Sequence, residues 1–288
     1  MSALLQVEGV SGASITNQQL ASEDEKEKIT ELRACTSECT SKLKLNDLSP
    51  EATSDFKFLR FLRGYKGNVK EAAAAFSDMV EWRLENDVAG IITTLKKVEE
   101  DEGLLPFPYD MPLFQPLVEA FGTQDGVMRF NNTRDRSRNL LTSVAVGLFD
   151  LRKIVSAGLG DLLVKSNIFV DCYFEIVLER LSVENQRLMQ RHDLLIVSNP
   201  SIGLFQFSPS ALRLIKRVSL NSKHFPETIA KITSCGNNMM AVGIWKIIRP
   251  FVPKHTTDKI TVLGSSFLEE LEKTVELEAM EGFGRYVL

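Results

Sequence analysis

Beyond about residue 113, short β-rich runs alternate with longer helical patterns, and this alternation constrains the fold more than any other feature of the chain. The β-rich runs lie at 127–130, 194–197, 232–235 and 260–263, and helical patterns separate them at about 169–189, 209–222 and 239–252. Strands that alternate with helices favour a parallel or mixed sheet covered by helices. The sequence therefore predicts an α/β domain in this part of the chain.

The N-terminal part of the chain has a helical pattern without strands. Apolar residues recur at three-to-four spacing from Glu23 onward, and Ser49-Pro50-Glu51 is typical of a helix start. The charged segment from Glu99 to Gly103, with several prolines after it, indicates a linker. We expect a disordered tail (1–22), an N-terminal helical subdomain (23–92), the α/β domain (108–275) and a C-terminal tail (276–288).

The charge of the chain is slightly acidic overall but unevenly distributed. There are 34 Lys and Arg against 38 Asp and Glu, a formal net charge of −4. This average argues against general nucleic-acid binding, which needs clustered basic residues. Residues 211–260, however, hold nine Lys and Arg and two acidic residues, so this segment carries +7 and the remainder −11. A basic segment in an acidic protein predicts one anion-facing surface, and solvated helix faces are the alternative.

Cysteine and histidine are too sparse to suggest a metal or redox site. Among four Cys and three His, Cys35 and Cys39 share a helix face, but no second pair lies nearby to complete a zinc site. We expect no metal and no cofactor, and thiols kept reduced. The N-terminus lacks a basic region before an apolar run, and no run of 18 uncharged apolar residues occurs. We therefore expect a cytoplasmic protein without a signal peptide or membrane span.

The sequence contains no recognisable catalytic motif. Gly158-Leu159-Gly160 lacks the third glycine and the preceding strand of a phosphate-binding loop. A Gly-x-Ser-x-Gly nucleophile motif does not occur. We therefore predict that the protein is not an enzyme.

Two stretches of the chain resemble the CRAL-TRIO family of lipid-binding and lipid-transfer proteins. The first runs from Phe58-Leu59-Arg60-Phe61-Leu62-Arg63 to Glu81-Trp82-Arg83 and is similar to the family's N-terminal helical signature. The second contains His224-Phe225-Pro226-Glu227-Thr228, Ile244–Val252 and Thr256–Ser266, similar to the family's Tyr-Pro-Glu corner, the helix before its Lys-Pro-Phe-Leu motif and its Lys-Ile strand. The resemblance covers residues 26–275. It implies a helical subdomain followed by a mixed or parallel β-sheet lipid-binding domain, flanked by helices, with an apolar cavity.

The pattern of residues 239–252 supports a lipid carrier independently. The apolar positions that would form a gate include Met240, Ile244, Trp245, Ile248 and Phe251. Lys246 and Arg249 are left on the other side of the helix. A helix that is apolar over most of its circumference and bounded by bases can cover an apolar cavity in solution and dip into an anionic membrane. An ordinary core helix is the alternative.

The resemblance also implies a headgroup site for phosphatidylinositol. Family members that transfer this lipid place a Glu of the Tyr-Pro-Glu corner, a Lys at the Lys-Ile strand and a Thr three residues earlier near the headgroup. By position these residues are Glu227, Lys259 and Thr256, with Lys66 as a further basic residue. An ammonium group can neutralise the phosphodiester, and hydroxyl and carboxylate groups can bond inositol hydroxyls. A helix-corner ion pair for Glu227 and a surface position for Lys259 are the alternatives.

We therefore expect a monomer that binds one lipid, phosphatidylinositol first, in a gated apolar cavity. It would transfer or present this lipid through transient contact with an anionic membrane surface. Members that also hold phosphatidylcholine carry hydroxyl groups where this chain has Asp193 and Leu195, which argues against a choline lipid. A carrier of a sterol- or tocopherol-like ligand and a regulatory interaction module with a vestigial cavity are the alternatives. An enzyme that uses Glu227 is a third.

Overall fold

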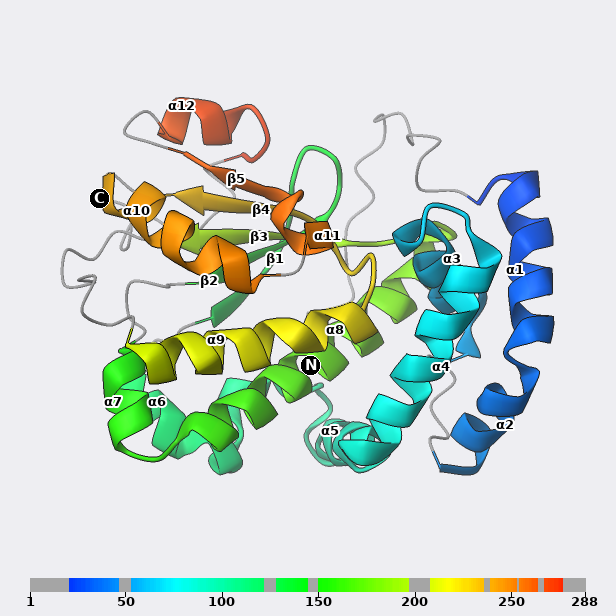
Figure 1. The fold of residues 1–288 in the computed structure, drawn as a ribbon, viewed down its shortest axis with the longest axis horizontal. Helices are drawn as coiled ribbons and strands as arrows, with labels where there is room; N and C mark the ends of the chain where they lie inside the picture. Colours follow the sequence, from blue (N-terminus) through cyan, green and yellow to red (C-terminus); the bar gives the residue numbers. More distant parts are fainter. Residues whose placement is uncertain are drawn as a thin grey trace. The chain divides into compact units, whose positions relative to one another are not determined.

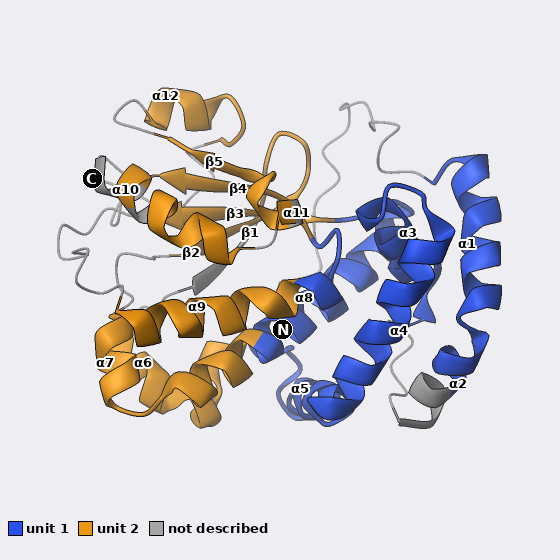
Figure 2. Cartoon of the chain, in the orientation of Figure 1, with its two compact units in different colours: residues 1–107, 168–189, 223–228 blue, residues 108–167, 190–222, 229–288 orange. Residues whose placement is uncertain are grey.

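The chain divides into two compact units, each assembled from separate segments (Figure 2). Unit 1 comprises residues 1–107, 168–189 and 223–228, and unit 2 comprises residues 108–167, 190–222 and 229–288. The computed structural model describes residues 21–46, 53–121, 128–144, 150–196, 208–235, 239–252, 254–263 and 267–276. The tails expected at 1–22 and 276–288 lie almost wholly outside the described residues.

The described secondary structure of unit 1 is helical (Figure 1). It contains α1 (Glu23–Cys35), α2 (Ser37–Asn46), α3 (Asp55–Gly64), α4 (Val69–Glu85), α5 (Val88–Glu102) and the C-terminal part of α8 (Gly160–Asn185). Ser22, Ser54 and Asn68 precede α1, α3 and α4, and each side chain accepts a bond from the backbone N–H three residues later. Such caps satisfy amides that have no partner within the helix, which explains where these helices begin.

Aromatic side chains of α3 and α4 form the centre of the unit 1 core. The Phe58 ring stacks on Phe76 with centroids 4.9 Å apart, and Phe61 meets Phe76 edge-on at 5.1 Å. All three are fully buried, and Leu32 of α1 closes the same cluster. Offset and edge-on ring pairs stabilise a core beyond the burial of their area.

Unit 2 is built on a five-stranded sheet in the order β1-β2-β3-β4-β5. The strands are β1 (Met128–Arg134), β2 (Leu140–Val144), β3 (Arg191–Ile196), β4 (Ile229–Cys235) and β5 (Ile260–Val262). β1 and β2 are antiparallel, and each of the other neighbouring pairs is parallel. The predicted class is confirmed: N-terminal helices precede a mixed, mostly parallel sheet with helices.

Short helices accompany the sheet. They are η3 (Pro108–Asp110), η4 (Pro112–Phe114), α6 (Gln115–Phe121), α7 (Leu151–Ser156), α9 (Pro209–Asn221), η7 (Ser222–His224), α10 (Met239–Ile248), η8 (Arg249–Phe251), α11 (Lys254–Thr257) and α12 (Phe267–Glu272). Phe267 and Leu271 of α12 pack with Leu141 and Leu194 in one buried cluster. Because side chains alternate along a strand, the neighbouring residue Asp193 lies on the opposite face of the sheet.

Local details differ from the sequence predictions in two places, and a third prediction is not tested. Glu99–Glu102 continue α5 instead of starting a linker, and Gly103 ends the helix with a φ of 72°. Glu99 is held there by Arg180, whose guanidinium lies 2.6 Å from its carboxylate. β2 was not predicted, because its five residues lack a strong alternating pattern. The helix start predicted at Ser49 lies outside the described residues, and α3 begins after the Ser54 cap.

Candidate functional site

The predicted corner at residues 224–228 lies between η7 and β4 and is mostly buried. Only Glu227 is partly exposed, and the Thr228 hydroxyl donates a bond to the Phe225 carbonyl at 2.9 Å. Glu227 has a φ of 53°. This left-handed conformation costs a residue other than glycine roughly 1–2 kcal/mol, so surrounding contacts must hold the corner in place.

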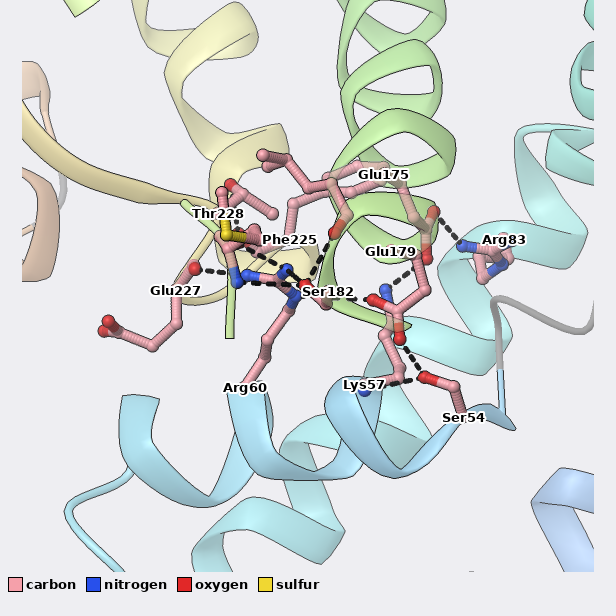
Figure 3. A network of polar contacts seen from close by, with 12 residues as sticks. Ser54, Lys57, Arg60, Arg83, Glu175, Glu179, Ser182, Phe225, Glu227 and Thr228 are labelled. Atoms are coloured by element: carbon pink, nitrogen blue, oxygen red, sulfur yellow. Dashed lines mark hydrogen bonds and ion pairs between the residues drawn. The ribbon is translucent and has the colours of Figure 1, made fainter. Parts of the chain in front are cut away.

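Arg60 of α3 supplies such contacts (Figure 3). One terminal nitrogen of its guanidinium donates to the Glu227 carbonyl at 2.6 Å, and the other donates to the Met189 carbonyl at 2.7 Å. The second nitrogen also lies 3.3 Å from the Ser182 hydroxyl. The side chain is almost fully buried. Arg60 thus joins α3, the end of α8 with the residues after it, and the corner.

A buried ion network surrounds Arg60 in unit 1. The Lys57 ammonium lies 2.5 Å from one oxygen of the Glu175 carboxylate, and the Arg83 guanidinium lies 2.8 Å from the other. Glu179, one turn later on α8, lies 3.6 Å from Arg60 and accepts a bond from the Ser54 hydroxyl. Buried charges persist in proteins when they are paired in this way.

The ion pairs decide the protonation state of Glu175. Burial alone would raise the pKa of this carboxyl, but the charges of Arg83 and Lys57 outweigh burial and lower the pKa to about 2. Burial lowers the pKa of both Lys57 and Arg60 and raises that of Glu179. Glu175 is therefore the fixed negative centre of the network.

Aromatic contacts with α4 also support the corner. The Trp82 ring of α4 stacks on the imidazole of His224 with centroids 4.4 Å apart and meets Phe225 edge-on at 5.6 Å. Burial, with the charge of Lys223 next to it, lowers the pKa of His224 to about 4, so the stacked ring is neutral at pH 7. The first stretch of the family resemblance and the corner of the second stretch therefore meet inside unit 1.

Lys259 and Thr256, two predicted headgroup residues, lie together at the start of β5 in unit 2. The Lys259 amide donates to the Thr256 carbonyl at 3.1 Å, and both residues are partly exposed. The Lys259 ammonium donates to the Ile229 carbonyl at 2.7 Å. Its position is thus fixed by the first residue of β4.

Lys66, the remaining predicted headgroup residue, lies in the turn that follows α3. It is exposed and has a φ of 54°. Its amide donates to the Arg63 carbonyl at 3.0 Å. This turn belongs to unit 1, as does Glu227.

The predicted gate corresponds to α10 and η8. Trp245, Ile248 and Phe251 are partly exposed, and Val242 is 42% exposed. Lys246 and Arg249 are exposed. The side chains of Met240 and Ile244 lie outside the described part of the structure. Among the side chains described in α10 and η8, none is fully buried, which distinguishes this apolar segment from an ordinary core helix.

Asp193, one of the two positions linked to choline lipids, is already engaged by protein groups. It accepts a bond from the Thr142 hydroxyl on β2 and another from the Arg191 guanidinium at 3.2 Å. The carboxylate is almost fully buried, whereas Leu195 on the same strand is partly exposed. A buried carboxylate with these partners is not set up to receive a lipid cation.

The sequence interpretation missed the ion network. Charged residues are expected at the surface, and the network pairs distant residues, 92 positions apart for Arg83–Glu175 and 118 for Lys57–Glu175. A usable signal was present, because Lys57 and Arg60 interrupt an otherwise apolar helix face, as do Glu175 and Glu179 on α8. Spacings of three and four place each pair on one side of its helix.

Two further properties concern the described residues only. No group of three or more His, Cys, Asp or Glu among them is placed to hold a metal ion. No helix in the described segments has the length and apolar character needed to cross a membrane.

Comparisons with known proteins identify relatives of this chain. The family model for the CRAL/TRIO domain matches residues 167–283. The chain is similar to the phosphatidylinositol/phosphatidylcholine transfer protein SFH7 of Arabidopsis thaliana, with 25% identity over 244 residues, which are 84% of this chain and 41% of that protein. It is also similar to the SEC14 cytosolic factor of Eremothecium gossypii, with 26% identity over 229 residues, 78% of this chain and 66% of that protein.

A solved structure shares the fold. The crystal structure of Sfh5 matches with a TM-score of 0.63 at 14% identity, over 89% of this chain and 85% of that chain. The chain spans about two-fifths of the length of SFH7 and of SFH12, a second Arabidopsis thaliana relative that carries the same descriptive name.

Proposed function

Since residues 167–283 belong to the CRAL/TRIO domain family, we propose that the protein binds a single membrane lipid, phosphatidylinositol, in an apolar cavity gated by residues 239–252. It transfers this lipid between membranes or presents it at one. Relatives named as phosphatidylinositol/phosphatidylcholine transfer proteins support this proposal. A relative named as a cytosolic factor supports a cytoplasmic location. The proposal further includes a monomer that touches anionic membranes transiently and catalyses no reaction.

The observation that carries the proposal is the partial exposure of an apolar helix. Trp245, Ile248 and Phe251 remain in contact with solvent although they belong to a strongly apolar stretch of the chain. Apolar surface of this kind marks a site for a membrane or an apolar ligand. Lys246 and Arg249 border it and would favour anionic lipid over neutral lipid.

The proposed headgroup ligands are Glu227, Thr256, Lys259 and Lys66. The Lys259 ammonium can neutralise the phosphodiester, while Thr256 and Glu227 can bond inositol hydroxyls. The buried bonds of Asp193 to Thr142 and Arg191 favour a second ligand other than a choline lipid. These roles are chemical assignments to positions on the corner, in α11, directly before β5 and in the turn after α3.

Native lipid identification tests the cargo. Lipids extracted from the purified protein are analysed by mass spectrometry, and phosphatidylinositol is expected. Recovery of neutral lipids alone would favour the sterol- or tocopherol-like alternative, and the lack of any lipid would favour an interaction module with a vestigial cavity.

Lys259→Ala tests the headgroup role. We expect phosphatidylinositol transfer between vesicles to fall about tenfold with little change in thermal stability, since a charge-assisted bond to phosphate contributes roughly 1.5–3 kcal/mol. Lys254→Ala is the matched control, because Lys254 is a lysine of α11 that is 89% exposed and pairs with the exposed Asp258 at 3.1 Å. Parallel losses of stability and transfer in the Lys259 variant would show that this lysine is structural.

A further inference from the structure

We infer that α3 positions the lipid-binding corner: Arg60, with Gly64 one turn later, holds Glu227 in the orientation in which its carboxylate meets the lipid headgroup. This inference rests on the proposed function of Glu227. It assigns no lipid contact to Arg60, which is buried and acts through the backbone of the corner. Arg60 is thus a positioning residue.

The first observation is the direction of the two polar groups of Glu227. Its carbonyl points into the ion network and accepts the Arg60 bond at 2.6 Å, whereas its side chain extends away from the network (Figure 3). The direction of a side chain follows from the orientation of the peptide planes beside it. A bond that fixes the Glu227 carbonyl therefore helps to fix the Cα–Cβ direction from which the carboxylate extends.

The second observation is the left-handed backbone of Glu227, with a φ of 53°. Residues other than glycine keep such a conformation only when the surrounding structure determines it. Thr228, the next residue, bonds back within the corner itself. The Arg60 bond, by contrast, ties the corner to a different part of unit 1 and so resists relaxation of Glu227 to an extended conformation.

The third observation is a close approach of α3 to the corner at Gly64. A Cβ atom added at Gly64 would lie 3.0 Å from Cβ of Pro226. This distance is shorter than an ordinary van der Waals contact, so a larger residue would displace the corner. Arg60 and Gly64 are four residues apart and lie on one side of α3. The corner therefore packs against that side of α3.

A lysine cannot replace Arg60 in this role. The guanidinium serves the Glu227 carbonyl, the Met189 carbonyl and the Glu179 carboxylate from different nitrogens. Lysine keeps the positive charge but offers one compact ammonium without the planar fork. Arg60→Lys therefore retains the charge opposite Glu179 while it weakens the hold on the corner.

The test separates positioning from stability. Transfer of labelled phosphatidylinositol is measured between phosphatidylcholine vesicles that contain increasing fractions of phosphatidylinositol. For Arg60→Lys we expect about a tenfold rise in the phosphatidylinositol fraction that gives half-maximal transfer, with the maximal rate kept within about twofold. Since Arg60 acts through Glu227, this rise should disappear when Arg60→Lys is introduced into a Glu227→Gln background.

Controls keep the test decisive. Arg83→Lys changes an equally buried arginine of the same network and should lower the thermal stability without moving the half-maximal fraction. Gly64→Val leaves every network residue in place and should raise that fraction about threefold. If Arg60→Lys does not fold, the Gly64→Val result decides the question.

The outcomes distinguish this inference from the proposed function. A wild-type protein that transfers no phosphatidylinositol refutes both. A wild-type half-maximal fraction in the folded Arg60→Lys variant refutes the inference alone. A rise in the half-maximal fraction that persists in full when Arg60→Lys is combined with Glu227→Gln also refutes the inference alone.

Discussion

Glu175→Gln should be among the most destabilising single substitutions in unit 1. The wild-type carboxylate compensates two buried cations, with Lys57 at 2.5 Å and Arg83 at 2.8 Å. The glutamine keeps the shape of the side chain but removes its charge, so Lys57 and Arg83 stay buried and lose the counter-charge that both of them contact. Removal of one partner from a buried ion pair costs roughly 3–5 kcal/mol.

The pKa of Glu175 gives an independent estimate of the same effect. Folding lowers this pKa from 4.5 to about 2, which corresponds to about 3 kcal/mol of stability at neutral pH at 1.36 kcal/mol per pH unit. Because the pKa is lowered, this stability is present above pH 4.5 and is lost as the pH falls toward 2. The variant should lack that part of the pH dependence.

Urea unfolding of both proteins at pH 7 and pH 3 measures these quantities. Glu99→Gln is the matched control, since it makes the same chemical change in an ion pair with Arg180 that remains partly exposed. We expect that control to cost less than about 1 kcal/mol. If Glu175→Gln costs no more than the control at pH 7, the ion network does not hold unit 1 together and the reasoning is wrong.

Three further predictions concern titration, thiol access and the gate. Since burial lowers the pKa of His224 to about 4, stability should fall as the pH drops from 6.5 to 4, and His224→Gln should remove about 2 kcal/mol of that fall in urea unfolding; an unchanged profile would contradict this. Iodoacetamide should label exposed Cys35 in the native protein, but Cys172 and Cys235 only after unfolding, because both are buried. Burial also raises the pKa of Cys235 to about 12, which keeps this thiol protonated and unreactive. Labelling of Cys172 or Cys235 in the native protein would refute this prediction. Trp245→Ala should weaken sedimentation with anionic vesicles about tenfold, and equal binding would exclude this residue from membrane contact.

The sheet was only partly predictable from the sequence. β3, β4 and β5 fall close to their predicted positions because their β-rich runs are bounded by helical patterns. β2 (Leu140–Val144) combines two leucines with Thr142 and Ser143, a run too short and too mixed to stand out. It becomes a strand through its neighbours, since β1 pairs with it on one side and β3 on the other.

Candidate site residues could be proposed from the sequence where position in a motif carries the information. Glu227 of the corner, Thr256 of α11 and Lys259 directly before β5 could be named as candidates from their motifs, whereas the contacts that support them could not. Lys57 lies between Phe56 and Phe58, which hints at a buried charge. Nothing in the sequence, however, indicates which residue more than a hundred positions away receives it.

Unit 1 is assembled from segments that lie far apart in the sequence, and this has a consequence for folding during synthesis. Lys57, Arg60 and Arg83 are made early, but their partners Glu175 and Glu179 on α8 and the carbonyl of Glu227 are made much later. During translation the N-terminal helices therefore leave the ribosome before the carboxylates of α8 that pair with these three cations have been made. We expect these helices to stay loosely packed until residue 228 has emerged, so that the beginning of the chain is among the last parts to reach its final packing.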